Sequence, residues 1–251
     1  MTQESRYDYP DADALAQAAA LELTQLAQSS IAARGIFTLA LAGGSTPKKL
    51  YSLLATDPVH RNFPWDKTQI FFGDERHVPP DHPDSNYLMV KNTLLSTGLV
   101  PEANLHRICA ELPDAKRAAA DCEIEMHTIF PESMRLNGFP RFDAILLGMG
   151  PDGHTASLFP DSLGLAEKKL WIISNWVEKF KTDRITFTFP VLNAARHVLL
   201  LVAGADKTDM LRQVLVDYRD KPVYPVQHVQ PLDGAKIWML DHAAAAKLPP
   251  A

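Results

Sequence analysis

The stretch IFTLALAGGSTPKKL, from Ile36 to Leu50, decides the expected fold. Its first seven residues are mostly apolar and predict a buried strand, GGSTP predicts a turn, and the residues that follow predict a helix through Leu54. Upstream, residues 11–34 have the pattern of an amphipathic helix, with Asp11 near its cap and a glycine after its end. The chain therefore begins as helix, strand, turn and helix.

The same alternation of apolar strands and helices continues along the chain. Strands are predicted at 69–74, 105–109, 142–148, 197–204 and the start of 237–248, and helices at 86–95, 113–130, 206–216 and the end of 237–248. Residues 171–177 and 184–189 are predicted to be extended. We expect an α/β fold, an open and largely parallel doubly wound sheet with helices on both faces, in a single domain over residues 1–251. Ligands of such sheets bind beyond the carboxyl ends of the strands.

Composition excludes several classes of protein. The 251 residues are 46% hydrophobic and 22% charged, as in ordinary globular proteins, and the formal net charge of -5 argues against a nucleic-acid partner. No apolar run is long enough to span a bilayer, and the first residues do not resemble a signal peptide. Cys109 and Cys122 form no C-x-x-C pair, which favours free thiols in a reducing compartment. We expect a cytoplasmic protein without a membrane partner; the sequence does not indicate whether it has protein partners.

The first candidate loop is GGST, which follows the strand at 36–42. Gly44 lets the backbone approach a ligand, Ser45 and Thr46 add hydroxyl groups, and the exposed amides of the next helix favour an anion. A phosphate or a carboxylate fits such a loop. An ordinary tight turn with a helix cap is the alternative. No Gly-Lys-Ser/Thr follows, so this is not a Walker A loop.

The second candidate loop, DERH, follows the strand at 69–74. Asp74 and Arg76 stand where a ligand is expected, and the guanidinium of Arg76 suits a phosphate, a carboxylate or a developing oxyanion. The alternative is an Asp–Arg pair that braces the loop. His77 and His82 are separated by two prolines, which prevents the helical display of a His-x-x-x-His metal site, and we expect no metal.

The third candidate loop, GMGPDGHTASLFP (148–160), has the glycine spacing of a dinucleotide-binding turn. That motif requires a helix after the glycines and an acidic residue about 20 positions later. Pro160 interrupts any helix, and no acidic residue closes a second strand at that distance: the nearest such candidate, Glu178, comes too late. Asp152 and His154 instead suggest a general base oriented by a carboxylate, because histidine titrates nearest neutrality. A histidine that satisfies backbone groups of the loop is the alternative.

Two further cations, Arg184 and Lys207, follow or begin predicted strands. Together they could complete an anion site that begins at GGST, although each alone fits a solvated surface charge. A serine nucleophile is not indicated, because Ser157 and Ser162 lie in no G-x-S-x-G elbow.

The order of these segments carries a resemblance to a known family. LAGGSTP, FFGDERHVPPDHPDSNY, ILLGMGPDGHTASLFP, RITFTFPVLNAARHV and AGADK together resemble the 6-phosphogluconolactonases, from about Gly35 to the final helix. The resemblance implies hydrolysis of 6-phosphoglucono-δ-lactone to 6-phosphogluconate in the pentose phosphate pathway, with no metal or organic cofactor. It also implies a fold similar to that of glucosamine-6-phosphate deaminases and ribose-5-phosphate isomerases.

The resemblance also implies roles for particular residues. His154 would be the general base, with Asp152 beside it and Asp74 and Arg76 lining the pocket. The 6-phosphate would be held by Gly44, Ser45, Thr46, Arg184 and Lys207. The segment WVEKFKTD before Arg184 departs from the proline-rich run of many relatives.

Two other functions are weighed against the lactonase. A related deaminase or isomerase would carry a glutamate near Phe159 and a tyrosine at Arg76, and both positions here agree with the lactonase. A non-catalytic sugar-phosphate sensor would need an output module, for which this chain has no spare length.

Overall fold

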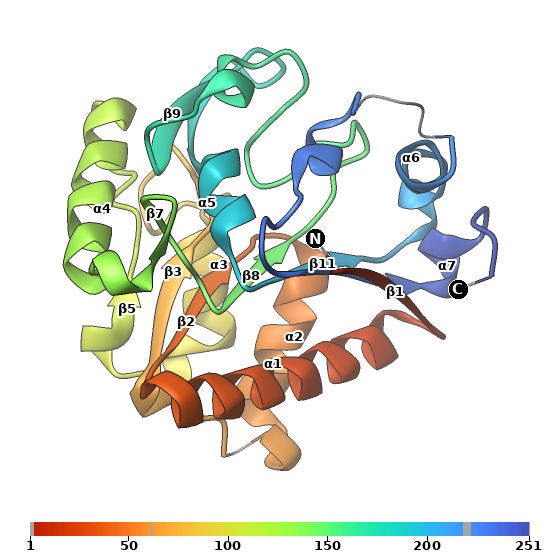
Figure 1. Cartoon of the computed structure of the whole chain (residues 1–251), viewed down its shortest axis with the longest axis horizontal. Coiled ribbons are helices and arrows are strands. Elements are labelled where there is room, and N and C mark those ends of the chain that lie inside the picture. Colours follow the sequence, from red (N-terminus) through yellow and green to blue (C-terminus); the bar gives the residue numbers. More distant parts are fainter. Residues whose placement is uncertain (1–2, 61, 218–221, 251) are drawn as a thin grey trace.

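The structure is a computed structural model that describes residues 3–60, 62–217 and 222–250 (Figure 1). Its centre is a sheet of seven strands in the order β1-β12-β11-β8-β2-β3-β5, and every neighbouring pair is parallel. The strands are β1 (Gln3–Tyr9), β2 (Phe37–Leu41), β3 (Thr68–Phe72), β5 (Leu105–His106), β8 (Ala144–Leu147), β11 (His197–Val202) and β12 (Ala235–Asp241). The predicted open parallel sheet is confirmed.

Helices cover this sheet on both sides. Figure 1 shows α1 and α2 on one side and α5 on the other. The helices are α1 (Ala12–Arg34), α2 (Ser45–Thr56), α3 (Asn86–Thr93), α4 (Ala115–Ile129), α5 (Phe189–Ala194), α6 (Thr208–Leu215) and α7 (His242–Ala245). In the described ranges, no helix has the length and apolar character needed to cross a membrane.

Local sequence explains the boundaries of α1. The side chain of Asp11 accepts hydrogen bonds from the amides of Asp13 and Ala14, and Gly35, with φ of 78°, ends the helix by donating its amide to the carbonyl of Ile31. The cap satisfies amides that would otherwise lack partners, and glycine adopts this left-handed conformation without steric cost.

Burial explains which strands the sequence reveals. All residues of β2 and β8 are buried, so these strands are continuous apolar runs rather than alternating ones. The edge strand β1 was not predicted, because its sequence QESRYDY is polar and partly exposed. Its parallel pairing with β12, from Gln3 opposite Ala235 to Tyr9 opposite Asp241, holds it in the sheet.

A second, antiparallel sheet consists of β4 (Asp74–Arg76), β10 (Thr182–Phe187) and β9 (Ile172–Val177). The extended segments predicted at 171–177 and 184–189 therefore form strands, but outside the main sheet. The second one ends two residues early, because α5 begins at Phe189 with a proline in its first turn. A small antiparallel hairpin is formed by β6 (Arg135–Leu136) and β7 (Phe139–Pro140).

Aromatic packing joins the two sheets. The Phe142 ring lies 5.2 Å from Phe71 on β3, 4.7 Å from Phe130 after α4, and 5.3 Å from Phe187 on β10, measured between centroids. All four side chains are buried. This cluster fixes the second sheet, which carries Asp74 and Arg76, against the first.

Candidate active site

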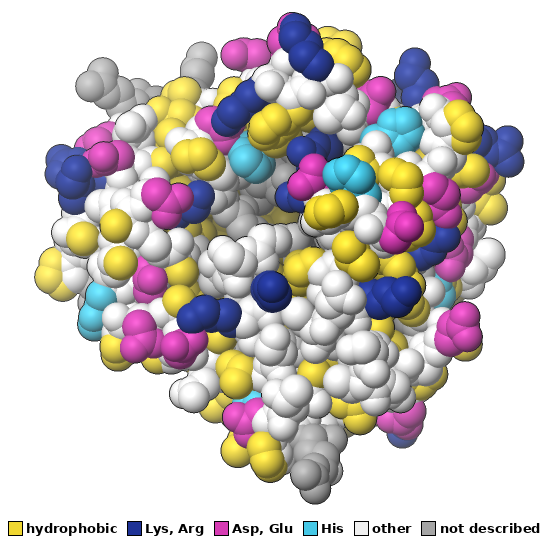
Figure 2. Space-filling model, turned by 180° about the vertical axis from the view of Figure 1, so that it is seen from behind, with side chains coloured by type: hydrophobic (Ala, Val, Ile, Leu, Met, Phe, Trp, Pro, Cys, Tyr) yellow, Lys and Arg dark blue, Asp and Glu magenta, His cyan; other side chains and the backbone are white. Residues whose placement is uncertain are grey.

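Loops from the carboxyl ends of β2, β3, β8 and β11 enclose a cavity of about 250 Å³. The space-filling view shows a hollow near the middle of its face, bordered by basic and histidine side chains (Figure 2). Seven of the predicted site residues line the cavity: Gly44, Ser45, Thr46, Asp74, Arg76, His154 and Lys207. Their place agrees with the rule that ligands of parallel sheets bind at this edge.

The beginning of α2 supplies backbone donors to the cavity. Gly44 is the N-cap, has φ of 104° and provides no side-chain cap, so the first amides of the helix stay available to an anion. Its neighbour Gly43 must also be glycine, because a Cβ there would lie 1.9 Å from Oδ1 of Asn86. The GGST loop is thus closely packed against Asn86 on one side and lines the cavity on the other.

Asp74 is buried and held on both carboxylate oxygens. The hydroxyl of Ser157 donates to Oδ2 at 2.5 Å. The side-chain amide of Asn86 donates through Nδ2 to Oδ1 at 3.3 Å and to the backbone carbonyl of Asp74 at 2.9 Å. Side chains from two separate segments therefore fix this carboxylate.

Arg76 is positioned by the buried carboxylate of Glu75. Glu75 accepts hydrogen bonds from the amides of Arg76, Asn86 and Tyr87, which draws the loop before α3 against β4. Burial raises the pKa of Glu75, and the three amide bonds oppose that rise. Nη1 of Arg76 donates to the carbonyl of Asp84 at 2.6 Å. Its Nε is buried with no hydrogen-bond partner among the described residues.

The loop after β8 presents His154 beside Asp152. The turn closes with hydrogen bonds from the Gly150 amide to the His154 carbonyl at 2.9 Å and from the Gly153 amide to the Gly150 carbonyl at 3.1 Å. Nδ1 of His154 lies 2.5 Å from Oδ1 of Asp152. An ionised carboxylate can only accept, so the proton of neutral His154 is on Nδ1 and the lone pair is on Nε2.

The surroundings keep His154 neutral near physiological pH. Burial lowers the pKa of His154, the hydrogen bond to Asp152 opposes this, and the charge of Lys179 lowers it further. Its ring stacks on Phe159, with centroids 4.0 Å apart. Burial alone would raise the pKa of Asp152, but the bond from His154 brings it below the ordinary value. Nζ of Lys179 lies 3.4 Å from Oδ2 of Asp152.

The two remaining predicted cations differ in position. Lys207 lines the cavity, and its Nζ lies 3.0 Å from Asp206. Arg184 pairs with Arg76 in the register of β10 and β4, and it is absent from the described residues that line the cavity. Burial lowers the pKa of Arg184, and the neighbouring charge of Arg76 lowers it further.

Other candidates from the sequence have structural partners. Nε2 of His77 lies 2.8 Å from the carbonyl of Leu112, and Nδ1 of His82 accepts from the Asp84 amide at 3.1 Å. In the described part of the chain, no group of three or more His, Cys, Asp or Glu side chains is arranged to hold a metal ion. Cys109 and Cys122 are free.

The sequence did not reveal several residues that position the site: Glu75, Asn86, Ser157 and Lys179. Ser157 contacts Asp74 across 83 positions, and Lys179 contacts Asp152 across 27, so no local pattern signals either contact. The one available signal was the polar DSNY segment, where Asn86 follows a helix-capping serine.

Comparison with known proteins identifies the family. Residues 10–238 match the model of the glucosamine-6-phosphate isomerases/6-phosphogluconolactonase family. The chain is 43% identical over 241 residues to a 6-phosphogluconolactonase of Nostoc, covering 95% of this chain and 96% of that one. It is also 43% identical over 222 residues to a 6-phosphogluconolactonase of Synechocystis, covering 88% of each.

Solved structures agree with this assignment. The 6-phosphogluconolactonase from Trypanosoma cruzi matches with a TM-score of 0.87 and 28% identity, covering 100% of this chain and 99% of that one. A monomeric glucosamine-6-phosphate deaminase, at 16% identity and a TM-score of 0.75, covers 98% of this chain and 99% of its own and shares the fold. The chain therefore belongs to the glucosamine-6-phosphate isomerase/6-phosphogluconolactonase family.

Proposed function

We propose that this protein hydrolyses 6-phosphoglucono-δ-lactone to 6-phosphogluconate, the lactone-opening step of the pentose phosphate pathway. One observation carries the proposal: a neutral histidine, oriented by Asp152, shares a cavity with the anion-binding loop GGST. The 43% identity to named 6-phosphogluconolactonases over most of the chain supports it.

The phosphate end of the substrate binds where the positive groups gather. The candidate ligands are Gly44, Ser45, Thr46, Lys207 and, beside Arg76, Arg184. Helix amides and a lysine suit a phosphate because both present N–H donors and positive potential. Binding at the phosphate orients the lactone carbonyl, which lies elsewhere in the molecule, toward the histidine.

His154 acts as the general base. Its Nε2 takes a proton from water while the water oxygen attacks the lactone carbonyl carbon, and an imidazolium forms beside Asp152. The tetrahedral intermediate then collapses, the bond to the ring oxygen breaks, and the imidazolium returns its proton to that oxygen. Asp152 keeps the imidazole in the required tautomer and stabilises its charged form.

Arg76 is the donor that we assign to the oxyanion. The amides of Gly150 and Gly153 in the neighbouring loop are used in hydrogen bonds within that loop. Arg76 lines the cavity, carries a fixed positive charge and has a buried Nε without a hydrogen-bond partner among the described residues. A preorganised cation stabilises the negative charge that develops on the carbonyl oxygen.

A sugar-phosphate deaminase or isomerase is the competing enzyme. Such a reaction requires an additional proton shuttle, and the ring that stacks on His154 belongs to Phe159, which cannot exchange a proton. Release of ammonia or formation of a ketose would identify these activities. Binding of 6-phosphogluconate with no lactone hydrolysis would instead favour a sensor.

The test is lactone hydrolysis above the spontaneous rate, measured with a chelator present. We expect activity that the chelator does not abolish, and a large loss in Arg76→Ala as well as in His154→Ala. Activity that disappears with the chelator would contradict a metal-free mechanism. We further propose that the enzyme works as a single domain in the cytoplasm, which one continuous hydrophobic core and two free cysteines support.

A further inference from the structure

A second polar cavity lies at the opposite edge of the main sheet. It has a volume of about 560 Å³ and adjoins the amino ends of β1, β11 and β12. The six residues of β11 separate the two edges by about 20 Å, at about 3.3 Å per residue. We call it the basal cavity, and it is lined by Gln3, Leu26, Ser29, Ser30, Ala33, Arg34, Arg141, Arg196, His197, Asp233, Gly234 and Ala235.

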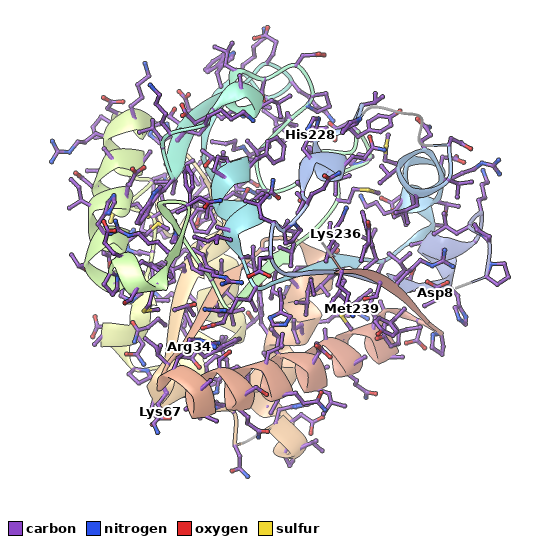
Figure 3. All side chains as sticks on the ribbon, in the orientation of Figure 1. Asp8, Arg34, Lys67, His228, Lys236 and Met239 are labelled. Carbon is purple, nitrogen blue, oxygen red and sulfur yellow. The ribbon has the colours of Figure 1, made fainter. Side chains whose placement is uncertain are left out.

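Three arginines from distant segments converge on this cavity. Arg34 ends α1, where Figure 3 labels it (Figure 3). Arg141 precedes β8, and Arg196 precedes β11. Their like charges repel one another: burial lowers the pKa of Arg196 most, and the neighbouring charges of Arg141 and Arg34 lower it further.

The acidic partners do not balance these arginines. Asp143 lies 2.6 Å from Arg34 and 3.3 Å from Arg196, and it also accepts hydrogen bonds from the amide and hydroxyl of Thr38. Asp233 pairs with Arg141 at 2.7 Å, but its side chain is 76% exposed. Three arginines against two aspartates leave a net positive charge, and one of the aspartates is solvated.

In the described ranges, buried guanidinium nitrogens without a hydrogen-bond partner occur at only two places. Five buried side-chain nitrogen or oxygen atoms there lack a hydrogen-bond partner, and four of the five are arginine Nε atoms. Arg76, which lines the candidate active site, and its β-register neighbour Arg184 supply two of them; Arg141 and Arg196 supply the other two at the basal cavity, where Nε of Arg196 still lies 3.3 Å from Oδ1 of Asp143. Buried donors are normally paired, so Nε of Arg141, which has neither a hydrogen bond nor an ion-pair contact among the described residues, indicates a missing acceptor.

We propose that the basal cavity is a second anion site, which binds a small molecule carrying phosphate groups. Arg141 and Arg196 would donate to phosphate oxygens in the forked geometry that a guanidinium offers, and the hydroxyls of Ser29 and Ser30 lie in the same lining. A volume of about 560 Å³ is within the range of small-molecule sites.

A purely structural role, in which the three arginines hold the Asp143 carboxylate in place, is the alternative to anion binding. It accounts for Arg34 and Arg196, which contact that buried carboxylate directly. It does not account for Arg141, whose ion-pair partner is the exposed Asp233 and whose Nε is nevertheless buried and unpaired within the described residues. Arg141 is therefore the residue whose replacement separates anion binding from structural support.

The experiment measures pyrophosphate binding by isothermal titration calorimetry at low ionic strength. The background protein carries Lys207→Gln and Arg184→Gln, which weakens the anion site proposed at the other edge of the sheet. We expect one binding event in this background, and we expect Arg141→Gln to weaken it about tenfold or more. The matched control Arg117→Gln removes the same charge from an exposed pair with Asp121 on α4 and should change the affinity less than twofold.

Two results would overturn the proposal: no pyrophosphate binding in the background protein, or equal affinities for Arg141→Gln and Arg117→Gln. Thermal unfolding of each variant shows whether it is folded, and pyrophosphate should raise the midpoint of the background protein but raise it less in Arg141→Gln. Lactone hydrolysis is assayed separately in Arg141→Gln alone and should be unchanged. Failure of the lactonase proposal would leave the calorimetric result unaffected.

Discussion

Replacing Gly150 with alanine adds one methyl group against the His154–Asp152 pair. The new Cβ would lie 2.0 Å from Nδ1 and 2.1 Å from Cε1 of His154, and 2.8 Å from Oδ1 of Asp152. Non-bonded carbon atoms approach to about 3.5 Å, so the imidazole or the loop must move by about 1.5 Å. A displacement of about 1 Å in a catalytic group can lower the rate about 10²-fold. We therefore expect Gly150→Ala to lower kcat for lactone hydrolysis by about 10²-fold or more.

The assay compares lactone hydrolysis with the spontaneous rate, and it reports kcat and KM separately. Gly148→Ala is the matched control, because the same methyl in the same loop meets no atom within 4 Å. Gly148 lines the cavity, so any effect of this control should fall on KM rather than kcat. If folded Gly150→Ala retained the wild-type kcat, the claim that this loop holds a catalytic pair in a fixed geometry would be refuted.

Three further variants test separate parts of the structure. Activity requires neutral His154, so the rate should rise with pH through a pKa that lies below the ordinary histidine value of about 6.5. The charge of Lys179 lowers this pKa, so Lys179→Gln should shift the rise in activity to higher pH. Lys207→Gln removes a cation from the cavity and should raise KM about tenfold with a smaller effect on kcat. Phe142→Ala opens a hole between the two sheets and should lower the free energy of unfolding by about 3–5 kcal/mol, measured by urea denaturation.

Each of these variants has a control and a contradicting outcome. Lys181→Gln, in the same turn as Lys179, should leave the pH profile in place, and a shift to lower pH in Lys179→Gln would contradict the charge argument. Lys48→Gln, on the exposed side of α2, is the control for Lys207→Gln and should leave KM unchanged. Equal effects of Lys48→Gln and Lys207→Gln on KM would show that Lys207 does not bind the substrate. Leu163→Ala, the control for Phe142→Ala, should cost little stability, because that side chain is 91% exposed; an equal loss in the two variants would contradict the packing argument.

Local sequence was sufficient for the elements whose causes are local. The buried strand at 36–42 was visible because both of its faces are covered, and α1 was visible because Asp11 and Gly35 cap it. The polar strand β1 was missed, because its place in the sheet comes from main-chain pairing with β12 rather than from apolar side chains. The location of 171–177 in a separate antiparallel sheet also depends on long-range pairing.

Local sequence likewise indicated some residues of the candidate site but not the contacts between them. Glycines, charged residues and a histidine after apolar strands indicated Gly44, Arg76 and His154, because parallel strands bring their carboxyl ends to one edge. The sequence could not show that Arg184 lies opposite Arg76 or that Ser157 holds Asp74. These contacts join segments that only the folded chain brings together.

The central claim is that His154 is the base that activates water. Its most direct test is the turnover of 6-phosphoglucono-δ-lactone by folded His154→Ala, compared with wild type and with the uncatalysed reaction. A positioned general base contributes about 10²- to 10⁴-fold, so we predict that kcat falls by that factor while the thermal midpoint changes little. Wild-type turnover in folded His154→Ala would contradict the account.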